Sequence, residues 1–388
     1  MQWLNRAMLR LHTENTLDRE EKIMSEWLKT SLIDIVELIG GGTPKTSKAE
    51  YWGGNINWLS VKDFNNENRY VYSTEKTITE EGLNNSSTKL LRKDDIIISA
   101  RGTVGELSMI PFPMAFNQSC YGIRAKEGID STFLYYLIKH SVRKLKAMTH
   151  GSVFDTITRD TFANIDVAIP DIEMQQRVAK MLANIDDKVE NNQRINNNLS
   201  AMAYDIYMHN FFSKKPNAKL KDILTEAEKS AIQVGEAKTS NGEYPFFTSG
   251  ATILKWNEPF VDGRNCFLNT GGNADVKFYV GKAAYSTDTW SISAKSEMSD
   301  YLYLMLFSIK PELDQKFFQG TGLKHLQKPL LKDRPIYVPE KLELEAFNRQ
   351  VMPMFDIISE NTRENQQLTS LRDWLLPMLM NGQATISD

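Results

Sequence analysis

The sequence predicts an α+β protein made of two mixed α/β globular domains, each followed by one long helix. Two observations predict this plan. A stretch with heptad spacing occurs twice, over 171–212 and over 340–382, and the segments that precede the two copies align at a shift of about 169 positions. Because an internal repeat defines the architecture of the whole chain, the order should be domain, helix, domain, helix.

The heptad stretches predict helices with one apolar seam. Apolar residues occupy most positions of a four-three spacing. In the first copy they include Val178, Leu182, Ile185, Val189, Leu199 and Ile206. In the second they include Phe347, Val351, Ile358 and Leu368, and Leu375 continues the spacing one step out of phase. Such a seam must be buried against another helix. At 1.5 Å per residue each helix would be roughly 60 Å long. We expect the two to pair as an antiparallel coiled coil, with Pro353 kinking the second helix or marking its start.

The repeat extends into the globular segments. The 169-residue shift places Arg101-Gly102 on Thr270-Gly271, and Tyr121 on Trp290. The predicted organisation is an N-terminal extension 1–26, a first domain 27–170, a first long helix 171–212, a second domain 213–339, and a second long helix with tail 340–388.

Composition excludes several classes of protein. The chain is 41% hydrophobic and 24% charged, as in ordinary soluble proteins. It holds no run of 18 apolar residues, which predicts no membrane span, and residues 1–26 lack the pattern of a signal peptide. The two cysteines, Cys120 and Cys266, give neither a disulfide framework nor a zinc-binding spacing, so we expect a reducing cytoplasm as the setting.

The formal net charge of −3 conceals an asymmetry between the segments. Lys and Arg number 17 against 16 Asp and Glu in residues 27–170, and 17 against 14 in 213–339; the helical segments 171–212 and 340–388 hold 4 against 6 and 4 against 8. Neutral to basic domains joined by acidic helices are compatible with nucleic acid on the domains and protein partners on the helices.

The first domain opens with a glycine-rich loop, IGGGTPKTSKAEYWGGNINWLSVKDF over residues 39–64. Glycines allow backbone N–H groups to approach a ligand, and lysine and threonine side chains reach phosphate oxygens. The loop does not match the phosphate-binding pattern G-x-x-x-x-G-K-[ST]. A purely structural turn and a ligand-binding loop both remain open, and the basic residues of the predicted helix 131–151 also fit a solvated helix face.

Motifs for catalysis are absent from the sequence. It holds no H-E-x-x-H, no G-x-S-x-G, no cysteine–histidine metal spacing and no glycine-rich cofactor loop. The acids of the PDIE segment at 170–173 lie where a helix should begin, and acids favour that end of the helix dipole. The pattern favours a binding protein over an enzyme.

The opening loop, the two-fold repeat, and the helix starts IPDIEMQQ and VPEKLELEAF together resemble the specificity subunits of type I restriction–modification enzymes, over about residues 27–383. The resemblance implies two target recognition domains, each reading one half of a bipartite, asymmetric site in double-stranded DNA. It also implies that the paired helices fix the separation of the domains and dock two methyltransferase subunits, while restriction subunits can join. Adenosylmethionine, ATP and magnesium would then bind to those partners, and this chain would bind no cofactor or metal and catalyse nothing.

We selected candidate DNA contacts by loop position and chemistry. They are Thr43, Lys45, Thr46, Lys48, Tyr51, Arg101, Arg143 and Lys146 in the first domain, and Thr248, Ser249, Lys255, Asn273, Lys277, Lys324 and His325 in the second. Two rival functions remain open: a coiled-coil scaffold whose two domains bind ligands other than DNA, and a self-contained enzyme. Salt-dependent binding of duplex DNA and activity of the isolated chain would separate the three.

Overall fold

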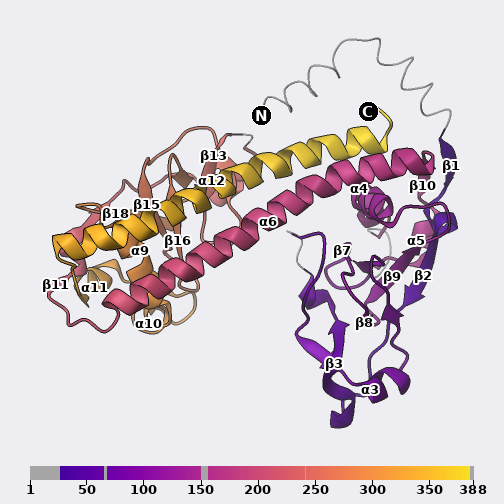
Figure 1. Ribbon diagram of the computed structural model, residues 1–388, viewed down its shortest axis with the longest axis horizontal. Helices are drawn as coiled ribbons and strands as arrows, with labels where there is room; N and C mark the ends of the chain where they lie inside the picture. Colours follow the sequence, from indigo (N-terminus) through magenta and orange to yellow (C-terminus); the bar gives the residue numbers. More distant parts are fainter. Residues whose placement is uncertain (1–26, 65–67, 150–155, 241, 385–388) are drawn as a thin grey trace. The chain divides into compact units, whose positions relative to one another are not determined.

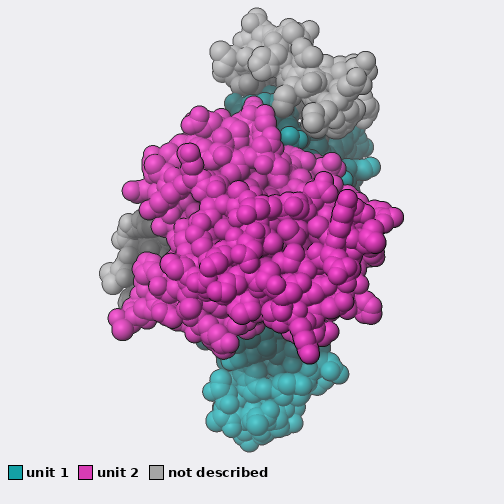
Figure 2. All heavy atoms as spheres, turned by 90° about the vertical axis from the view of Figure 1, so that its left-hand side faces the viewer, with its two compact units in different colours: residues 1–190, 367–388 teal, residues 191–366 magenta. Residues whose placement is uncertain are grey.

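The computed structural model describes residues 27–64, 68–149, 156–240 and 242–384. They form two compact units, one within residues 1–190 and 367–388 and the other within residues 191–366 (Figure 2). This division by spatial contact cuts both long helices. The domain boundaries predicted from the sequence stay predictions.

The first unit contains a four-stranded antiparallel sheet in the order β2 (Val36–Gly40), β9 (Cys120–Ala125), β6 (Ile96–Ser99) and β7 (Leu107–Met109). The strand β6 is buried along its whole length, as expected of a central strand made of three isoleucines and a serine. Helix α4 (Ser131–Thr149) packs on this sheet and presents Phe133, Leu134 and Leu137 to the core (Figure 1).

A second sheet of the first unit carries the loops that matter below. Its order is β4 (Lys76–Ile78), β3 (Trp52–Leu59), β8 (Met114–Phe116) and β5 (Leu90–Leu91), with β3 and β8 parallel. The remaining elements are β1 (Leu28–Ser31), paired with β10 (Asp166–Ile169), the short helices α3 (Glu80–Asn84) and α5 (Arg159–Ala163), and the 3-10 turns η1 (Leu32–Ile35), η2 (Ala49–Tyr51) and η3 (Val61–Asp63).

The second unit repeats the first sheet strand for strand. Its order is β12 (Leu224–Glu226), β18 (Thr289–Ala294), β15 (Arg264–Asn269) and β16 (Val276–Val280), again antiparallel. A three-stranded sheet β14 (Leu254–Trp256), β13 (Tyr244–Phe247) and β17 (Ala284–Tyr285) lies beside it in place of the four-stranded second sheet. The other elements are β11 (Ala218–Lys219), β19 (Phe318–Gln319), β20 (His325–Leu326), β21 (Pro335–Ile336), α7 (Leu220–Ile223), α8 (Val234–Ala237), α9 (Ser299–Ser308), α10 (Lys310–Glu312), the π-helical turn η4 (Leu313–Phe317) and α11 (Lys328–Lys332).

The predicted repeat is confirmed, with one correction at the glycine turn. The glycine with positive φ is Gly102 in the first unit (80°) and Gly272 in the second (77°). Two residues before these glycines, Ala100 and Thr270 are structurally equivalent. The Ala100 carbonyl oxygen accepts the N–H of Ile157, just before α5, and the Thr270 carbonyl oxygen accepts the N–H of Leu326, just before α11, both at 3.0 Å. The alignment that placed Gly102 on Gly271 was therefore wrong by one residue, because identity in the two turns was too low to fix the register.

The predicted long helices are α6 (Ile172–Phe211) and α12 (Lys341–Met380), each of 40 residues and starting 169 positions apart (Figure 1). Within the first unit Arg372 contacts Asp186, and within the second Asn365 contacts Asn192. Positions that rise along α6 thus fall along α12, which confirms the antiparallel pairing. Of the predicted seam, Val178, Leu182, Val189, Phe347, Val351 and Leu375 are buried, and Ile185, Leu199, Ile206, Ile358 and Leu368 are half-buried.

The expectation about Pro353 was wrong in one respect, because α12 begins at Lys341 and runs through the proline. Proline removes one backbone donor and crowds the preceding turn. Pro353 lies on the exposed side of the helix, where water can hydrate the carbonyl that loses its partner, while the neighbouring Val351 and Phe355 are anchored in the core. Packing of the apolar face outweighs the local cost. Among the described residues, no helix is long and apolar enough to cross a membrane.

Candidate nucleic-acid interface

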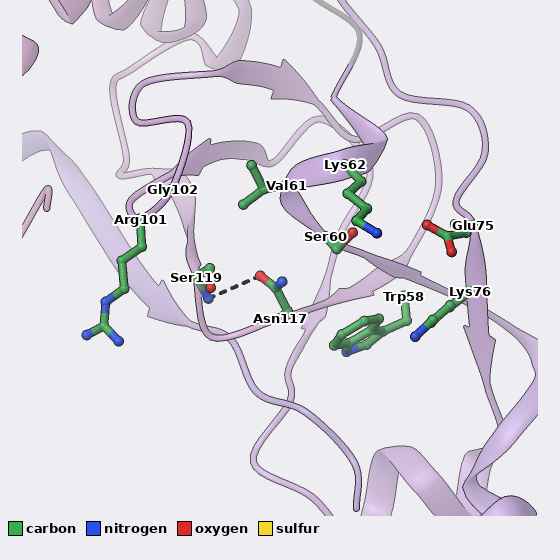
Figure 3. Close-up of a pocket in the computed structure, with 10 residues that line it drawn as sticks. All are labelled: Trp58, Ser60, Val61, Lys62, Glu75, Lys76, Arg101, Gly102, Asn117 and Ser119. Carbon is green, nitrogen blue, oxygen red and sulfur yellow. Dashed lines mark hydrogen bonds between the residues drawn. The ribbon is translucent and has the colours of Figure 1, made fainter. Parts of the chain in front are cut away.

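Loops at one end of the second sheet of the first unit surround a hollow of about 370 Å³. Figure 3 shows Ser60, Asn117 and Ser119 around its middle, with Lys62, Glu75 and Lys76 on one side and Arg101 on the other. Trp58, Val61 and Gly102 complete the lining. Hydroxyl, amide and cationic groups thus line the hollow beside an indole ring, a combination suited to phosphate and base-edge contacts.

Asp63 holds two of these loops together. One carboxylate oxygen accepts the backbone N–H of Ser60 at 2.7 Å and its hydroxyl at 2.8 Å. The other oxygen accepts the backbone N–H of Glu75 at 2.7 Å. Because one carboxylate binds both loops, it fixes the positions of the backbone segments that bear Lys62 and Lys76.

The far side of the hollow is a turn fastened to a neighbouring loop. The carbonyl oxygen of Ser119 accepts the backbone N–H of Ala100 at 2.8 Å and that of Arg101 at 3.2 Å. The side-chain oxygen of Asn117 in turn accepts the backbone N–H of Ser119, at 3.1 Å (Figure 3). The Arg101 guanidinium is exposed and has no hydrogen-bond partner among the described residues, so it is available to a ligand.

The balance of charge around the hollow is positive, with Lys62, Lys76 and Arg101 against Glu75. The Lys76 ammonium also lies 5.6 Å from the centre of the Trp52 ring, which itself packs edge-on against Trp58 at 5.1 Å. An excess of cations at a concave surface attracts the phosphate backbone of nucleic acids.

The glycine-rich opening loop packs beside the hollow. The Gly42 N–H donates to the Phe116 carbonyl oxygen at 3.0 Å, the Trp58 indole donates to the Gly42 carbonyl oxygen at 3.0 Å, and the Thr43 hydroxyl donates to the side chain of Gln118. A Cβ at Gly42 would lie 2.3 Å from the backbone nitrogen of Thr88. Close backbone packing thus explains that glycine, and ligand binding by the loop stays a prediction.

The other candidates of this loop differ in exposure and in their partners. Lys45 and Thr46 are exposed, and the Lys48 ammonium is 3.0 Å from the Glu50 carboxylate. Tyr51 is half-buried, and its carbonyl oxygen accepts the backbone N–H of Thr79 at 3.0 Å.

Of the two candidates on α4, the structure describes the side chain of Lys146. The stem of Lys146 packs on the Gly105 turn, since a Cβ at Gly105 would lie 2.5 Å from its Cε. The side chain of Arg143 lies outside the described residues. Lys146 does not line the hollow.

In the second unit, several candidates meet around the glycine turn that follows β15, but the polar atoms of two of them are engaged internally. The Lys277 ammonium donates to the Thr248 carbonyl oxygen at 2.9 Å and pairs with Asp275 at 3.3 Å. The Thr248 hydroxyl accepts the Gly250 N–H at 3.0 Å, and Thr248 is buried. These residues build the turn.

Other candidates of the second unit are nearer to solvent. Asn273 and His325 are exposed, and Gly271 forms an isolated bridge with His325. Lys324 pairs with Asp314 at 3.3 Å; the pKa of that carboxyl is lowered, first by the Ala274 N–H and then by Lys324.

Two candidates remain in the second unit. The Ser249 carbonyl oxygen accepts the Asn269 amide at 3.0 Å. Lys255 lies in the edge strand β14 opposite Pro245. The structure therefore gathers the candidates near the glycine turn and leaves Lys255 on another sheet.

Sequence reasoning missed most of the residues that line the hollow. The residues not selected include Trp58, Lys62, Lys76, Asn117 and Ser119. All but Lys62, which lies in η3, stand in a strand or directly beside one. Polar residues directly after predicted strands were the available signal. Their convergence depends on the pairing of β3 with β8, which sequence alone does not reveal.

Comparison with known proteins identifies the family. The model of the type I restriction modification DNA specificity domain matches twice, at residues 24–201 and 214–369, which covers most of the chain. The chain therefore belongs to this family and is a specificity subunit of a type I restriction–modification system. The two matches agree with the two-fold repeat of the structure.

Relatives extend over the whole chain or over one half of it. The type I restriction enzyme MjaIX specificity subunit of Methanocaldococcus jannaschii is 25% identical over 95% of both chains. The EcoR124I/EcoR124II specificity subunit of Escherichia coli is 31% identical over 42% of this chain and 41% of its own length. A solved S subunit from M. genitalium shares the fold, with a TM-score of 0.60 and 15% identity over 93% of this chain and 97% of that one.

Proposed function

We propose that this subunit reads a bipartite, asymmetric site in double-stranded DNA, each unit contacting one half-site through the loops of its sheets. The hollow between the Arg101 turn and the Lys62 and Lys76 loops carries the proposal, because it joins cations, neutral hydrogen-bonding groups and an aromatic ring on one rigid frame. The second unit has the same sheet order with other loops, which supports an unlike second half-site.

The chemistry on DNA would belong to partners. In this proposal, two methyltransferase subunits dock on α6 and α12, bind adenosylmethionine and methylate adenine after flipping the base, while restriction subunits supply ATP- and magnesium-dependent cleavage. This subunit would position them and catalyse nothing itself. Its task would be selective binding.

Replacing Lys76 and Arg101 by alanine should separate two kinds of contact. A lysine that contacts phosphate contributes affinity on every sequence, so Lys76→Ala should weaken binding uniformly and lower the salt slope of log K by about 1. An arginine that reads a base contributes discrimination, so Arg101→Ala should cost about 1–3 kcal/mol on the target and less on other duplexes. Fluorescence anisotropy of the subunit with its methyltransferase partner, measured over a salt series, gives both quantities.

Lys29→Ala is the matched control, because Lys29 is an exposed lysine of the same unit on β1, outside the lining of the hollow. Its affinity and salt slope should equal those of the wild type. If Lys29→Ala weakens binding as much as Lys76→Ala does, or if both hollow variants bind normally, the first half-site is not contacted through the hollow.

A further inference from the structure

Four asparagines interrupt the apolar seam between α6 and α12 within the second unit. The Asn192 amide donates to the side-chain oxygen of Asn365 at 2.8 Å and to Glu364 at 2.7 Å. The Asn361 amide donates to the side-chain oxygen of Asn196 at 2.8 Å. Asn192 is only 1% exposed, and the other three asparagines are half-buried. We call Asn192, Asn196, Asn361 and Asn365 the asparagine cluster.

The cluster has a two-fold relation within the repeat. Asn192 and Asn361 are 169 positions apart, as are Asn196 and Asn365, so they are equivalent residues of the two helices. Asn192 therefore contacts Asn365, the equivalent of Asn196, and Asn196 contacts Asn361, the equivalent of Asn192. The helices meet at this point as two copies of one self-complementary surface.

Such a cluster discriminates between registers. In the observed register each amide meets an amide. A slip of one heptad would place Asn192 against Ile358 and Asn196 against Met354, both of which pack in the apolar seam. An amide that loses its partner in an apolar contact is left desolvated without a compensating hydrogen bond, which disfavours the slipped register. With leucine at these four positions that penalty would be absent.

We propose that the asparagine cluster fixes the register of α6 against α12, at a cost in stability relative to an apolar seam. A single polar layer in a coiled coil is known to specify register and partner number in this way. This proposal does not depend on which DNA is read, because it concerns only the pairing of α6 with α12.

Distances between spin labels on the full chain test the proposal. Labels at Asn198→Cys and Glu360→Cys, exposed positions of α6 and α12, report the axial offset of the helices. The native thiols do not compete, because Cys120 and Cys266 are buried and burial raises the pKa of Cys120 to about 12. The variant under test carries leucine at all four positions of the cluster.

We expect one narrow distance in the wild type. The leucine variant should add a population displaced by about 10 Å, one heptad of helix, and its melting temperature should rise by about 3–8 °C. The control Asn197→Leu with Gln350→Leu changes exposed amides of the same helices and should keep one distance. A leucine variant with the single wild-type distance, a lower melting temperature or no folded state overturns the proposal.

Discussion

Replacing Arg264 by alanine is expected to reduce the unfolding free energy of the second unit by about 3–5 kcal/mol, because a buried charge is left without its partner. The Arg264 guanidinium donates to both carboxylate oxygens of Asp300, at 2.6 and 2.8 Å, and to Asp356 of α12 at 2.6 Å. Asp300 is fully buried, and burial raises its pKa, which its hydrogen bonds and charge pairing with Arg264 oppose. Without Arg264 that carboxyl must stay charged and unpaired or take up a proton.

Denaturant unfolding and segment-resolved hydrogen exchange measure this effect, since exchange of β15 and α9 amides reports the second unit separately. Arg264→Lys should recover only part of the loss, because an ammonium cannot form the two-pronged contact with Asp300 and reach Asp356 as well. Lys341→Ala, which removes an exposed pair with Glu345 at 3.9 Å, is the control and should change stability by less than about 0.5 kcal/mol. Equal losses for Arg264→Ala and Lys341→Ala would contradict the anchoring role.

The second large effect is expected at Asp186, which joins three elements of the first unit. Its carboxylate accepts the Tyr136 hydroxyl of α4 at 2.6 Å and the Arg372 guanidinium of α12 at 2.8 Å, and it is 7% exposed. Asp186→Ala removes one charge of a nearly buried pair and the acceptor of a buried hydroxyl. We expect a loss of about 3–5 kcal/mol in the unfolding free energy of the first unit.

Hydrogen exchange of α4 and of the first half of α6 gives the measurement. Asp186→Asn keeps an acceptor for Tyr136 but removes the charge, so its loss should be intermediate. Glu173→Ala, at the start of the same helix, removes an exposed pair with Arg177 at 3.8 Å and should stay within about 1 kcal/mol of the wild type. A loss confined to α12, with α4 unaffected, would show that Tyr136 does not depend on this carboxylate.

The sequence predicted the elements whose signals are local. Heptad spacing gave both long helices to within two residues at each end. The exceptions are places where packing overrides a local rule. Proline disfavours the interior of an isolated helix, but α12 continues through Pro353 because the apolar residues around it are buried.

The anchors between sheets and helices could not be predicted. Asp187 and Asp356 are equivalent positions, 169 apart, and each accepts an arginine of its own unit, Arg69 at 2.6 Å and Arg264 at 2.6 Å. The two arginines come from different places in the repeat, since Arg69 precedes β6 and Arg264 opens β15. Contacts between residues far apart in the sequence leave no periodic signal. For the same reason, most of the residues that line the hollow could not be predicted.

A base-modification map of a host genome, with and without this gene beside its cognate methyltransferase subunit, tests whether this subunit reads a bipartite site in DNA. We expect a methylated adenine motif of two short, unlike halves around a fixed unread gap, present only when the gene is present. Absence of any new motif, although the methyltransferase subunit co-purifies with this chain, would contradict its role in reading DNA.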